Sequence, residues 1–392
     1  MKILHVVPTY IPAWRYGGTI QSVHGLCKAL TLRGHQVEVV TTSVDGASDS
    51  QVIHQEIQRV DGVNVRYFQS KSLRRIYWAP TMETFVRHQA KNFDLIHTHS
   101  IFLWPTWMAE RVARQQGIPY IVSPRGMLVK ELVRRKNPLL KNLWIQWVER
   151  KNLEQASAIH WTSDIEKEEA AKFSISLPQG FVIPNGAEIR SEDPPQDHFE
   201  ENLFKGLPAA SPLILFLGRI HWKKGLDRLI PALRHIPEAQ LVIVGNDEEG
   251  YGTFLKKLAA EHHVENRLHF FEPVYGAKKE ALYKRATVFA LPSYSENFGN
   301  TVLEAMSAGC PVLVTREVGL SGTVASCRAG LVSKGDPKAL AEALNQIISN
   351  PELGRQMGEN GMRAARESFG WPAIAGRMEN AYQQILEKAS QR

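Results

Sequence analysis

The chain has 392 residues, of which 43% are hydrophobic and 22% charged, and its formal net charge is +7. This length favours two domains, and the composition excludes a disordered or fibrous chain. The three cysteines have no CxxC spacing, which argues against a disulfide framework or zinc knuckle, and no segment has the roughly 20 apolar residues of a membrane-spanning helix.

Short apolar runs alternate with helix-like segments along most of the chain. The strand candidates lie at residues 3–7, 37–41, 94–98, 120–123, 158–162, 181–184, 213–218, 240–245, 268–271, 288–292 and 312–315. Apolar strands separated by amphipathic helices are typical of parallel sheets covered on both faces. The sequence therefore predicts an α/β fold with two doubly wound, Rossmann-like domains.

The predicted domain boundary lies in residues 188–212, where Pro, Ser and acidic residues are concentrated. We expect an N-terminal domain at 1–187 and a C-terminal domain at 188–370. Residues 371–392 repeat apolar side chains at steps of three or four, with no strand after them. They predict a helix that packs back onto the first domain.

Ligands of open parallel sheets bind beyond the carboxyl ends of the strands, so the loops there are the first candidates for a site. Gly17 and Gly18 follow the first strand, where they could admit a phosphate or form only a turn. Arg219 and Lys224 follow the strand at 213–218. A guanidinium fork and an ammonium charge could clamp a diphosphate there, and a solvated basic loop is the alternative.

The most informative segment is SENFGNTVLEAMSAGCP, which sets Glu296 and Glu304 eight residues apart. We expect a loop at 297–299 and then a helix, whose first amides, at Asn300 and Thr301, would face a phosphate. A structural cap is the competing role for Asn300. Such a site suits a ligand with hydroxyls at both ends and phosphates between them.

No Asp-x-Asp motif occurs, and the acidic cluster at 247–249 has the spacing of a solvated turn rather than a magnesium site. We therefore expect no metal and no cofactor. Cationic side chains and helix N-termini would then neutralise a leaving diphosphate.

Two histidines, His97 and His99, end the strand near residue 98, and we expect them to point to opposite faces of the sheet. His99, nearer the loop, is the better candidate for a site, although a buried histidine bonded to backbone is in general more common than a functional one. Arg125, in SPRGM, either recognises an anionic acceptor group or pins its own loop.

The positive charge is concentrated in the first half, because residues 1–190 hold 24 Lys and Arg against 16 Asp and Glu. Residues 130–151 contribute seven basic residues together with Trp144 and Trp147. They predict either an ordinary surface helix or a peripheral contact with anionic membrane. No nucleic-acid-binding module is recognisable, so we expect no nucleic-acid partner. The N-terminal apolar run is too short for a secretory signal, so we expect a cytoplasmic protein, which a membrane contact would place at the inner face of the plasma membrane.

Together these motifs resemble the retaining glycosyltransferase family 4. The resemblance implies the GT-B fold, in which two Rossmann-like domains face each other across a cleft and a C-terminal helix crosses back to the first domain. Its strongest element is the Glu-x7-Glu motif, matched by Glu296 and Glu304. By position, Glu296 would orient the donor sugar, Glu304 would bind the ribose, and Arg219 with Lys224 would stabilise the departing diphosphate.

The resemblance also assigns His99 to the catalytic group and places backbone near Val274 against the nucleobase. The donor-binding residues that it implies are Gly17, Gly18, Gly218, Val274, Asn297, Phe298, Gly299, Asn300, Thr301 and Glu304. Arg125 is the candidate acceptor-binding residue.

The implied activity is retaining, metal-independent transfer of a sugar from a UDP- or GDP-sugar to a glycan or polyprenyl-diphosphate-linked acceptor in polysaccharide biosynthesis. Two alternatives stay open at this point. One is a GT-B sugar-nucleotide epimerase or hydrolase, and the other is a non-catalytic protein that binds nucleotide sugars.

Overall fold

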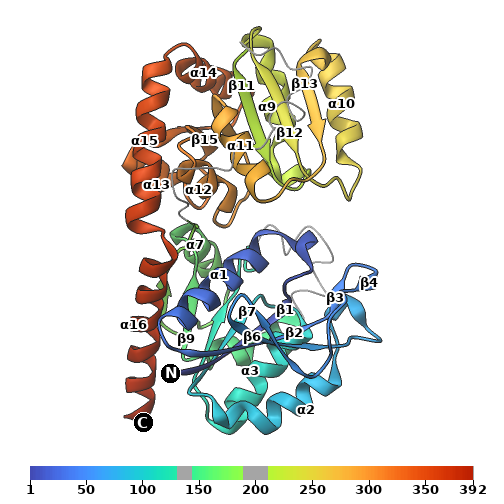
Figure 1. Ribbon diagram of the computed structural model, residues 1–392, viewed down its shortest axis with the longest axis vertical. Helices are drawn as coiled ribbons and strands as arrows, with labels where there is room; N and C mark the ends of the chain where they lie inside the picture. The colour runs from blue at the N-terminus through green and yellow to red at the C-terminus, as the bar shows by residue number, and fades with distance from the viewer. Residues whose placement is uncertain (130–143, 189–210, 392) are drawn as a thin grey trace. The chain divides into compact units, whose positions relative to one another are not determined.

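The structure is a computed structural model that describes residues 1–129, 144–188 and 211–391. Its chain forms two compact units (Figure 1). Unit 1 comprises Met1–Gly186 and Trp371–Arg392, and unit 2 comprises Ala187–Gly370. Most of the predicted linker at 188–212 lies outside the described residues.

Unit 1 is built on an eight-stranded sheet of order β10-β9-β8-β7-β1-β2-β6-β5. Its strands are parallel except β5, which pairs antiparallel with β6 at one edge. The strands of this unit are β1 (Lys2–Thr9), β2 (Gln36–Thr42), the small pair β3 (Val44–Asp45) and β4 (Ser48–Asp49), β5 (Ile57–Val60), β6 (Val63–Phe68), β7 (Leu95–His99), β8 (Tyr120–Ser123), β9 (Ala158–Trp161) and β10 (Gly180–Val182).

Helices cover both faces of this sheet. They are α1 (Gly18–Leu32), α2 (Pro80–Gln89), α3 (Trp104–Gln116), α6 (Arg150–Glu154), α7 (Asp164–Ala171) and α16 (Trp371–Ser390). One face packs against α1 and α16, which run side by side in Figure 1, and the other packs against α2 and α3. The predicted return of residues 371–392 to the first domain is confirmed, since α16 buries Ile374, Met378 and Tyr382 there.

The indole of Trp371, the first residue of α16, packs against Gly25 of α1 and against Gly186. A Cβ atom at Gly25 would lie 2.2 Å from the Trp371 indole, and one at Gly186 would lie 2.5 Å from it. Both distances are too short for any side chain. The two glycines therefore let the indole pack directly on backbone.

Unit 2 has a six-stranded parallel sheet of order β13-β12-β11-β14-β15-β16. Its elements are β11 (Leu213–Leu217), α9 (Leu226–Ala232), β12 (Gln240–Val244), α10 (Tyr251–Glu261), β13 (Leu268–Phe271), α11 (Ala277–Arg285), β14 (Val288–Leu291), α12 (Asn300–Ser307), β15 (Val312–Thr315), α13 (Ser321–Cys327), β16 (Gly330–Ser333), α14 (Pro337–Ile348) and α15 (Pro351–Ser368). This is the strand order of a dinucleotide-binding Rossmann fold. It reverses between β11 and β14, and ligands of such sheets bind at that point.

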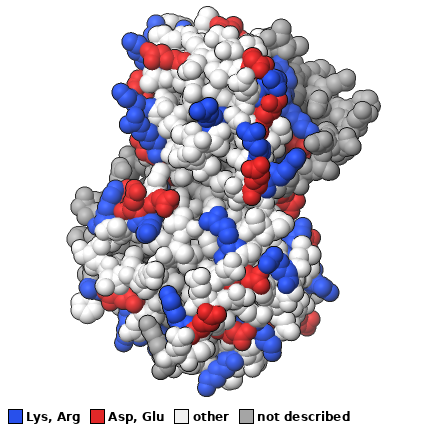
Figure 2. All heavy atoms as spheres, turned by 90° about the vertical axis from the view of Figure 1, so that its left-hand side faces the viewer, with Lys and Arg blue, Asp and Glu red and all other residues white. Residues whose placement is uncertain are grey.

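In the described part of the chain, no helix combines the length and apolarity needed to cross a bilayer. Figure 2, which looks onto the side that carries α15 and α16, shows basic and acidic side chains interspersed. On α15, Arg355 pairs with Glu352 and Glu359, and on α16 Glu379 pairs with Arg33 of α1. Among the described residues of these two helices, basic and acidic side chains are therefore mixed rather than gathered into one basic patch.

Candidate active site

The switch point of the second sheet brings two predicted residues into contact. Lys224 follows β11, Glu296 follows β14, and their side chains form an ion pair, with 22% and 19% of their surfaces exposed. The loops are tied together, because the Tyr294 amide donates to the Lys223 carbonyl at 2.7 Å. At Gly225, where φ is +70°, a Cβ would lie 1.9 Å from the Pro292 carbonyl oxygen, so only glycine permits this approach.

The backbone of Glu296 is held like an added strand. Its amide donates to the Glu317 carbonyl at 3.0 Å, and its carbonyl accepts from the Gly319 amide at 2.9 Å. A Cβ at Gly319 would lie 2.1 Å from the Asn297 carbonyl oxygen. The loop at 296–298 is thus fixed, and the carboxylate of Glu296 is held in place before any ligand binds.

Helix α12 begins at Asn300, after a left-handed Gly299 with φ +98°, which confirms the predicted loop and helix start. Thr301 lies in its first turn, where the helix dipole favours negative charge. Phe298, only 4% exposed, anchors the loop in the core of unit 2.

Glu304 lies one turn along α12 and contacts two side chains of α11. Its Oε2 accepts from the Tyr283 hydroxyl at 2.9 Å and pairs with Lys279. Burial raises the pKa of Tyr283 well above its usual value, so the phenol stays a donor at all ordinary pH values. Both carboxylates of the motif are therefore held by a lysine, and one of them also by a buried phenol.

The other predicted donor residues lie at the same carboxyl edge of this sheet. Gly218 follows β11 directly, and Arg219 beside it is exposed, with no hydrogen bond or ion pair to another described residue. Gly218 packs against Gly245, where a Cβ would lie 1.9 Å from the Gly218 carbonyl oxygen. Val274 follows β13 and is half-buried against the core.

Unit 1 carries the remaining predicted residues. Gly17, with φ +70°, precedes α1 beyond the carboxyl end of β1, and a Cβ there would meet no atom within 4 Å. Gly18 begins the helix. The loop thus has open space, which a side chain would fill.

The prediction that His97 and His99 point to opposite faces is wrong. Residues two apart on a strand lie on the same face, and the two rings are 4.2 Å apart between centroids. Both side chains are fully buried. Burial, with the nearby Arg125 charge, lowers the pKa of both rings well below the usual value, so they are neutral.

His99 has both ring nitrogens occupied. Its Nε2 lies 2.9 Å from Nδ1 of His5, and its Nδ1 lies 3.1 Å from the Arg125 guanidinium. The ring therefore offers no open nitrogen to a ligand in this structure. His99 can therefore influence a ligand only through Arg125, to which its Nδ1 is hydrogen-bonded.

Arg125 sits in a left-handed conformation, with φ +55°, which costs energy for any residue with a side chain. Its guanidinium donates to Oδ1 of Asn185 at 2.7 Å, and the following Gly126 amide donates to Glu166 at 2.6 Å. Burial lowers the pKa of Arg125 to about 10, so the group remains charged.

Three buried histidines, His5, His97 and His99, have ligand-capable nitrogens within 4.8 Å of one another. The hydrogen bond between His5 and His99 already occupies two of these nitrogens, and the Arg125 cation stands beside them. A second cation at this point would be repelled by the guanidinium. The cluster fits a hydrogen-bonded network better than a metal site.

The basic segment is described only from residue 144 onward, and the rest lies outside the described residues. Trp144 donates to Glu149 at 3.0 Å, whereas Trp147 is 84% exposed. The membrane contact therefore stays a prediction.

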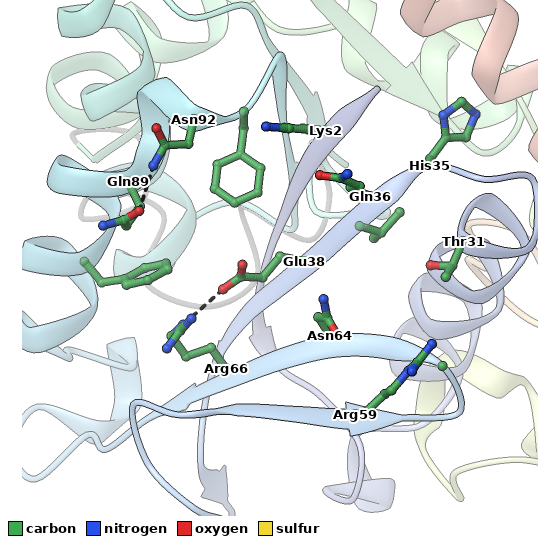
Figure 3. A pocket seen from close by; sticks show the side chains of 14 residues that line it. Lys2, Thr31, His35, Gln36, Glu38, Arg59, Asn64, Arg66, Gln89 and Asn92 are labelled. Carbon is green, nitrogen blue, oxygen red and sulfur yellow. Dashed lines mark hydrogen bonds and ion pairs between the residues drawn. The ribbon is translucent and has the colours of Figure 1, made fainter.

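A pocket of about 760 Å³ lies elsewhere in unit 1 (Figure 3). It is lined by Lys2 of β1, Glu38 of β2 and Arg66 of β6, and Glu38 and Arg66 form an ion pair at 3.0 Å. Lys2 and Gln36, which also lines the pocket, begin β1 and β2, and Glu38 lies in the first half of β2. The pocket is thus at the opposite edge of the sheet from the candidate site residues.

Several site residues had no sequence signal of their own. The helix that carries Lys279 and Tyr283 contains no recognisable motif. Three further residues are isolated polar residues in or beside predicted strands, with no motif around them: His5, His160 and Asn185. Only the strand order, which places β1 between β7 and β2, brings His5 to His99.

Comparisons with known proteins identify the family of this chain. The family model described as "Glycosyl transferase 4-like domain" matches residues 17–186, and "Glycosyl transferases group 1" matches residues 199–364. The chain belongs to the family 4 type of GT-B glycosyltransferases. Between them, the two models account for both units.

A D-inositol 3-phosphate glycosyltransferase of Xylanimonas cellulosilytica is 27% identical to this glycosyltransferase, over 95% of this chain and 93% of that protein. Among solved structures, the sucrose-phosphate synthase of Thermosynechococcus elongatus matches with a TM-score of 0.79 at 23% identity, covering 99% of this chain and 100% of that one. Anabaena HepE, solved with UDP and glucose, matches with a TM-score of 0.76 at 22% identity, covering 98% and 100%. The predicted GT-B fold, with two Rossmann-like domains, is confirmed.

Proposed function

We propose that this glycosyltransferase transfers a sugar from a UDP- or GDP-sugar, with retention of anomeric configuration and without a metal, to a glycan or polyprenyl-diphosphate-linked acceptor. Unit 2 would bind the donor and unit 1 the acceptor. Polysaccharide assembly at the inner face of the plasma membrane is the proposed setting. The solved complex of HepE with UDP and glucose supports a uridine nucleotide as the first donor to test.

The observation that carries the proposal is the pair Lys224 and Glu296 at the switch point of a dinucleotide-type sheet, with Glu304 one helical turn away. A donor sugar presents hydroxyls to Glu296, and its phosphates meet Lys224, Arg219 and the start of α12. The ribose hydroxyls meet Glu304. Without ligand, each carboxylate is neutralised by its own lysine.

Metal independence is supported by this supply of positive charge. The leaving diphosphate gains Lys224 and Arg219 as counter-charges, together with the dipole of α12. Glu296 is clamped by Lys224 and by its pinned backbone, which suits a residue that orients the sugar rather than one that attacks it. Retention would then arise from attack by the acceptor on the same face that the diphosphate leaves.

The acceptor is proposed to be anionic because of Arg125. This cation is largely desolvated, and its described hydrogen-bond partners, His99 and Asn185, are neutral. A phosphate or diphosphate group would supply the missing counter-charge. The basic balance of residues 1–190 would favour the same class of acceptor.

The test has two stages. Thermal unfolding with a panel of nucleotides and nucleotide sugars should identify one preferred ligand, because binding to the folded state raises its stability. The preferred donor is then incubated with polyprenyl-diphosphate glycans, with chelator present, and the new linkage is assigned by NMR.

Glu296→Gln should lower the rate of transfer by about 100-fold while the protein stays folded. Inversion at the anomeric carbon, a strict metal requirement or a trapped glycosyl adduct on Glu296 would each contradict the proposed mechanism. Full donor turnover without acceptor would point instead to a hydrolase or epimerase.

A further inference from the structure

Arg125 has an unusual set of neighbours for a buried cation. Its Nε is buried and has no hydrogen-bond partner among the described residues, and the residues that bond its other two nitrogens are neutral. The carboxylate that influences the pKa of Arg125, Glu166, is itself bonded to the amides of Gly126 and Thr162. The guanidinium thus has no anionic hydrogen-bond partner among the described residues, and its Nε–H is left unsatisfied.

The hydrogen bonds around His99 determine where its proton is. A guanidinium can only donate, so Nδ1 of His99 must accept from Arg125. A neutral ring then carries its proton on Nε2, which donates to Nδ1 of His5. His5 in turn carries its own proton on Nε2, since burial lowers the pKa of His5 to about 3 and the ring is neutral.

A second chain of hydrogen bonds fixes the neighbouring ring. The Ile183 carbonyl accepts from Nε2 of His160 at 2.9 Å, so Nδ1 of His160 accepts from Nε2 of His97 at 3.3 Å. Nδ1 of His97 then accepts from the Tyr382 hydroxyl at 2.7 Å. His97 packs on His99, so the second chain holds the first in place.

We propose that His5 is a positioning residue, which holds His99 in the tautomer that accepts from Arg125 and so aims the guanidinium at an anionic group of the acceptor. If His99 carried its proton on Nδ1 instead, two donors would face each other at 3.1 Å, and the guanidinium would have to turn away. The inference rests on the proposed acceptor role of Arg125. His5, a residue of β1, would thus contribute to acceptor binding without touching the acceptor.

The first measurement requires no substrate. In protein labelled with ¹⁵N-histidine, the resonances of His99 should show a neutral ring protonated at Nε2. A ring protonated at Nδ1, a charged ring, or zinc found by elemental analysis and bound by the cluster would overturn the positioning role.

The second measurement uses inorganic phosphate as the probe and the Nε–H resonance of Arg125 as the readout. His5→Leu removes the acceptor for His99 and should weaken phosphate binding at Arg125 by about tenfold. His5→Asn keeps an oxygen acceptor near the position of Nδ1, so its affinity for phosphate should lie within about threefold of the wild-type affinity. His88→Leu, at an exposed histidine of α2, is the matched control and should change nothing.

The outcomes separate the inference from the function on which it rests. Equal phosphate binding in wild type and His5→Leu would overturn the role of His5 alone. Absence of any phosphate response at Arg125 in the wild type would overturn the acceptor role of Arg125, and with it the inference. Should His5→Leu fail to fold, the ¹⁵N measurement on the wild type and the His5→Asn variant decide.

Discussion

At the residue scale, the Glu-x7-Glu motif is a pair of carboxylates that each have a cationic partner before any donor binds. Glu296 pairs with Lys224, and Glu304 pairs with Lys279 and accepts from Tyr283. Such partners fix the position of a carboxylate. The two acids can therefore accept hydrogen bonds from sugar hydroxyls without prior rearrangement of their backbones.

We expect Glu304→Gln to raise the KM for the donor by about tenfold with a smaller change in kcat, because the variant loses charge-assisted bonds to the bound ribose. Steady-state kinetics with the preferred donor measure this. Glu342→Gln, at an exposed position of α14, is the control. A large fall in kcat at unchanged KM would instead place Glu304 in the chemical step.

The buried histidines should make unit 1 sensitive to acid. Burial lowers the pKa of His160 to about 3, so between pH 6.5 and 3 the unfolded chain binds a proton that the folded state rejects. Its stabilising contribution is complete above pH 6.5 and declines as the pH falls. Glu110 and Glu149 act in the opposite sense, since burial raises the pKa of both carboxyls.

The contribution of one histidine can be isolated by difference. The stability of the wild type minus that of His160→Asn should fall by about 2 kcal/mol between pH 7 and pH 5, because the glutamate contributions cancel. Urea unfolding at the two pH values measures it. A difference that is independent of pH would show that His160 has the same pKa in the folded state as in the unfolded chain.

The residue types and spacing of the motif could be predicted from sequence, but its partners could not. Lys279 and Tyr283 are ordinary residues of an amphipathic helix until α11 packs beside α12. The same holds for His5, which meets His99 only because β1 and β7 are neighbours. The error about His97 and His99 was one of strand geometry, since alternate residues share a face.

At the element scale, the apolar strands were predictable and the half-polar ones were not. The eleven predicted runs all contain strands of the structure, and most of these strands are buried on both faces. In β6, by contrast, Val63 and Val65 face the core while Asn64 is exposed, so no continuous apolar run marks it. β5 was missed for the same reason, since its residues alternate between exposed and half-buried. β16 was missed because it has only two apolar residues, Leu331 and Val332, between Gly330 and Ser333.

The contact between α1 and α16 gives a prediction about stability. Gly25→Ala should lower the free energy of unfolding by about 1–3 kcal/mol, because the new methyl group would overlap the Trp371 ring. Gly322→Ala, on α13 with no atom within 4 Å of the new methyl group, should be neutral or slightly stabilising. Thermal unfolding of both variants compares them, and equal effects would contradict the packing of Trp371.

At the scale of the whole molecule, the two units have separate cores, and each half of the proposed reaction belongs to one of them. We expect the preferred nucleotide to raise the unfolding temperature of unit 2 directly. Gly25→Ala should lower that of unit 1. Differential scanning calorimetry of the wild type and the variant, with and without nucleotide, should show the shift of unit 2 and the shift of unit 1 as two separate effects. A nucleotide that raises the unfolding temperature of unit 1 alone would contradict the assignment of the donor site.

The path of the chain has a consequence for synthesis on the ribosome. Residues 187–370 leave the ribosome as a continuous segment, so unit 2 can fold as soon as they emerge. Unit 1 must wait for α16, which closes one face of its sheet and brings the Tyr382 hydroxyl to His97. A nascent chain arrested before Trp371 would therefore already hold the lysine-paired carboxylates, while the histidine network behind Arg125 would still be incomplete.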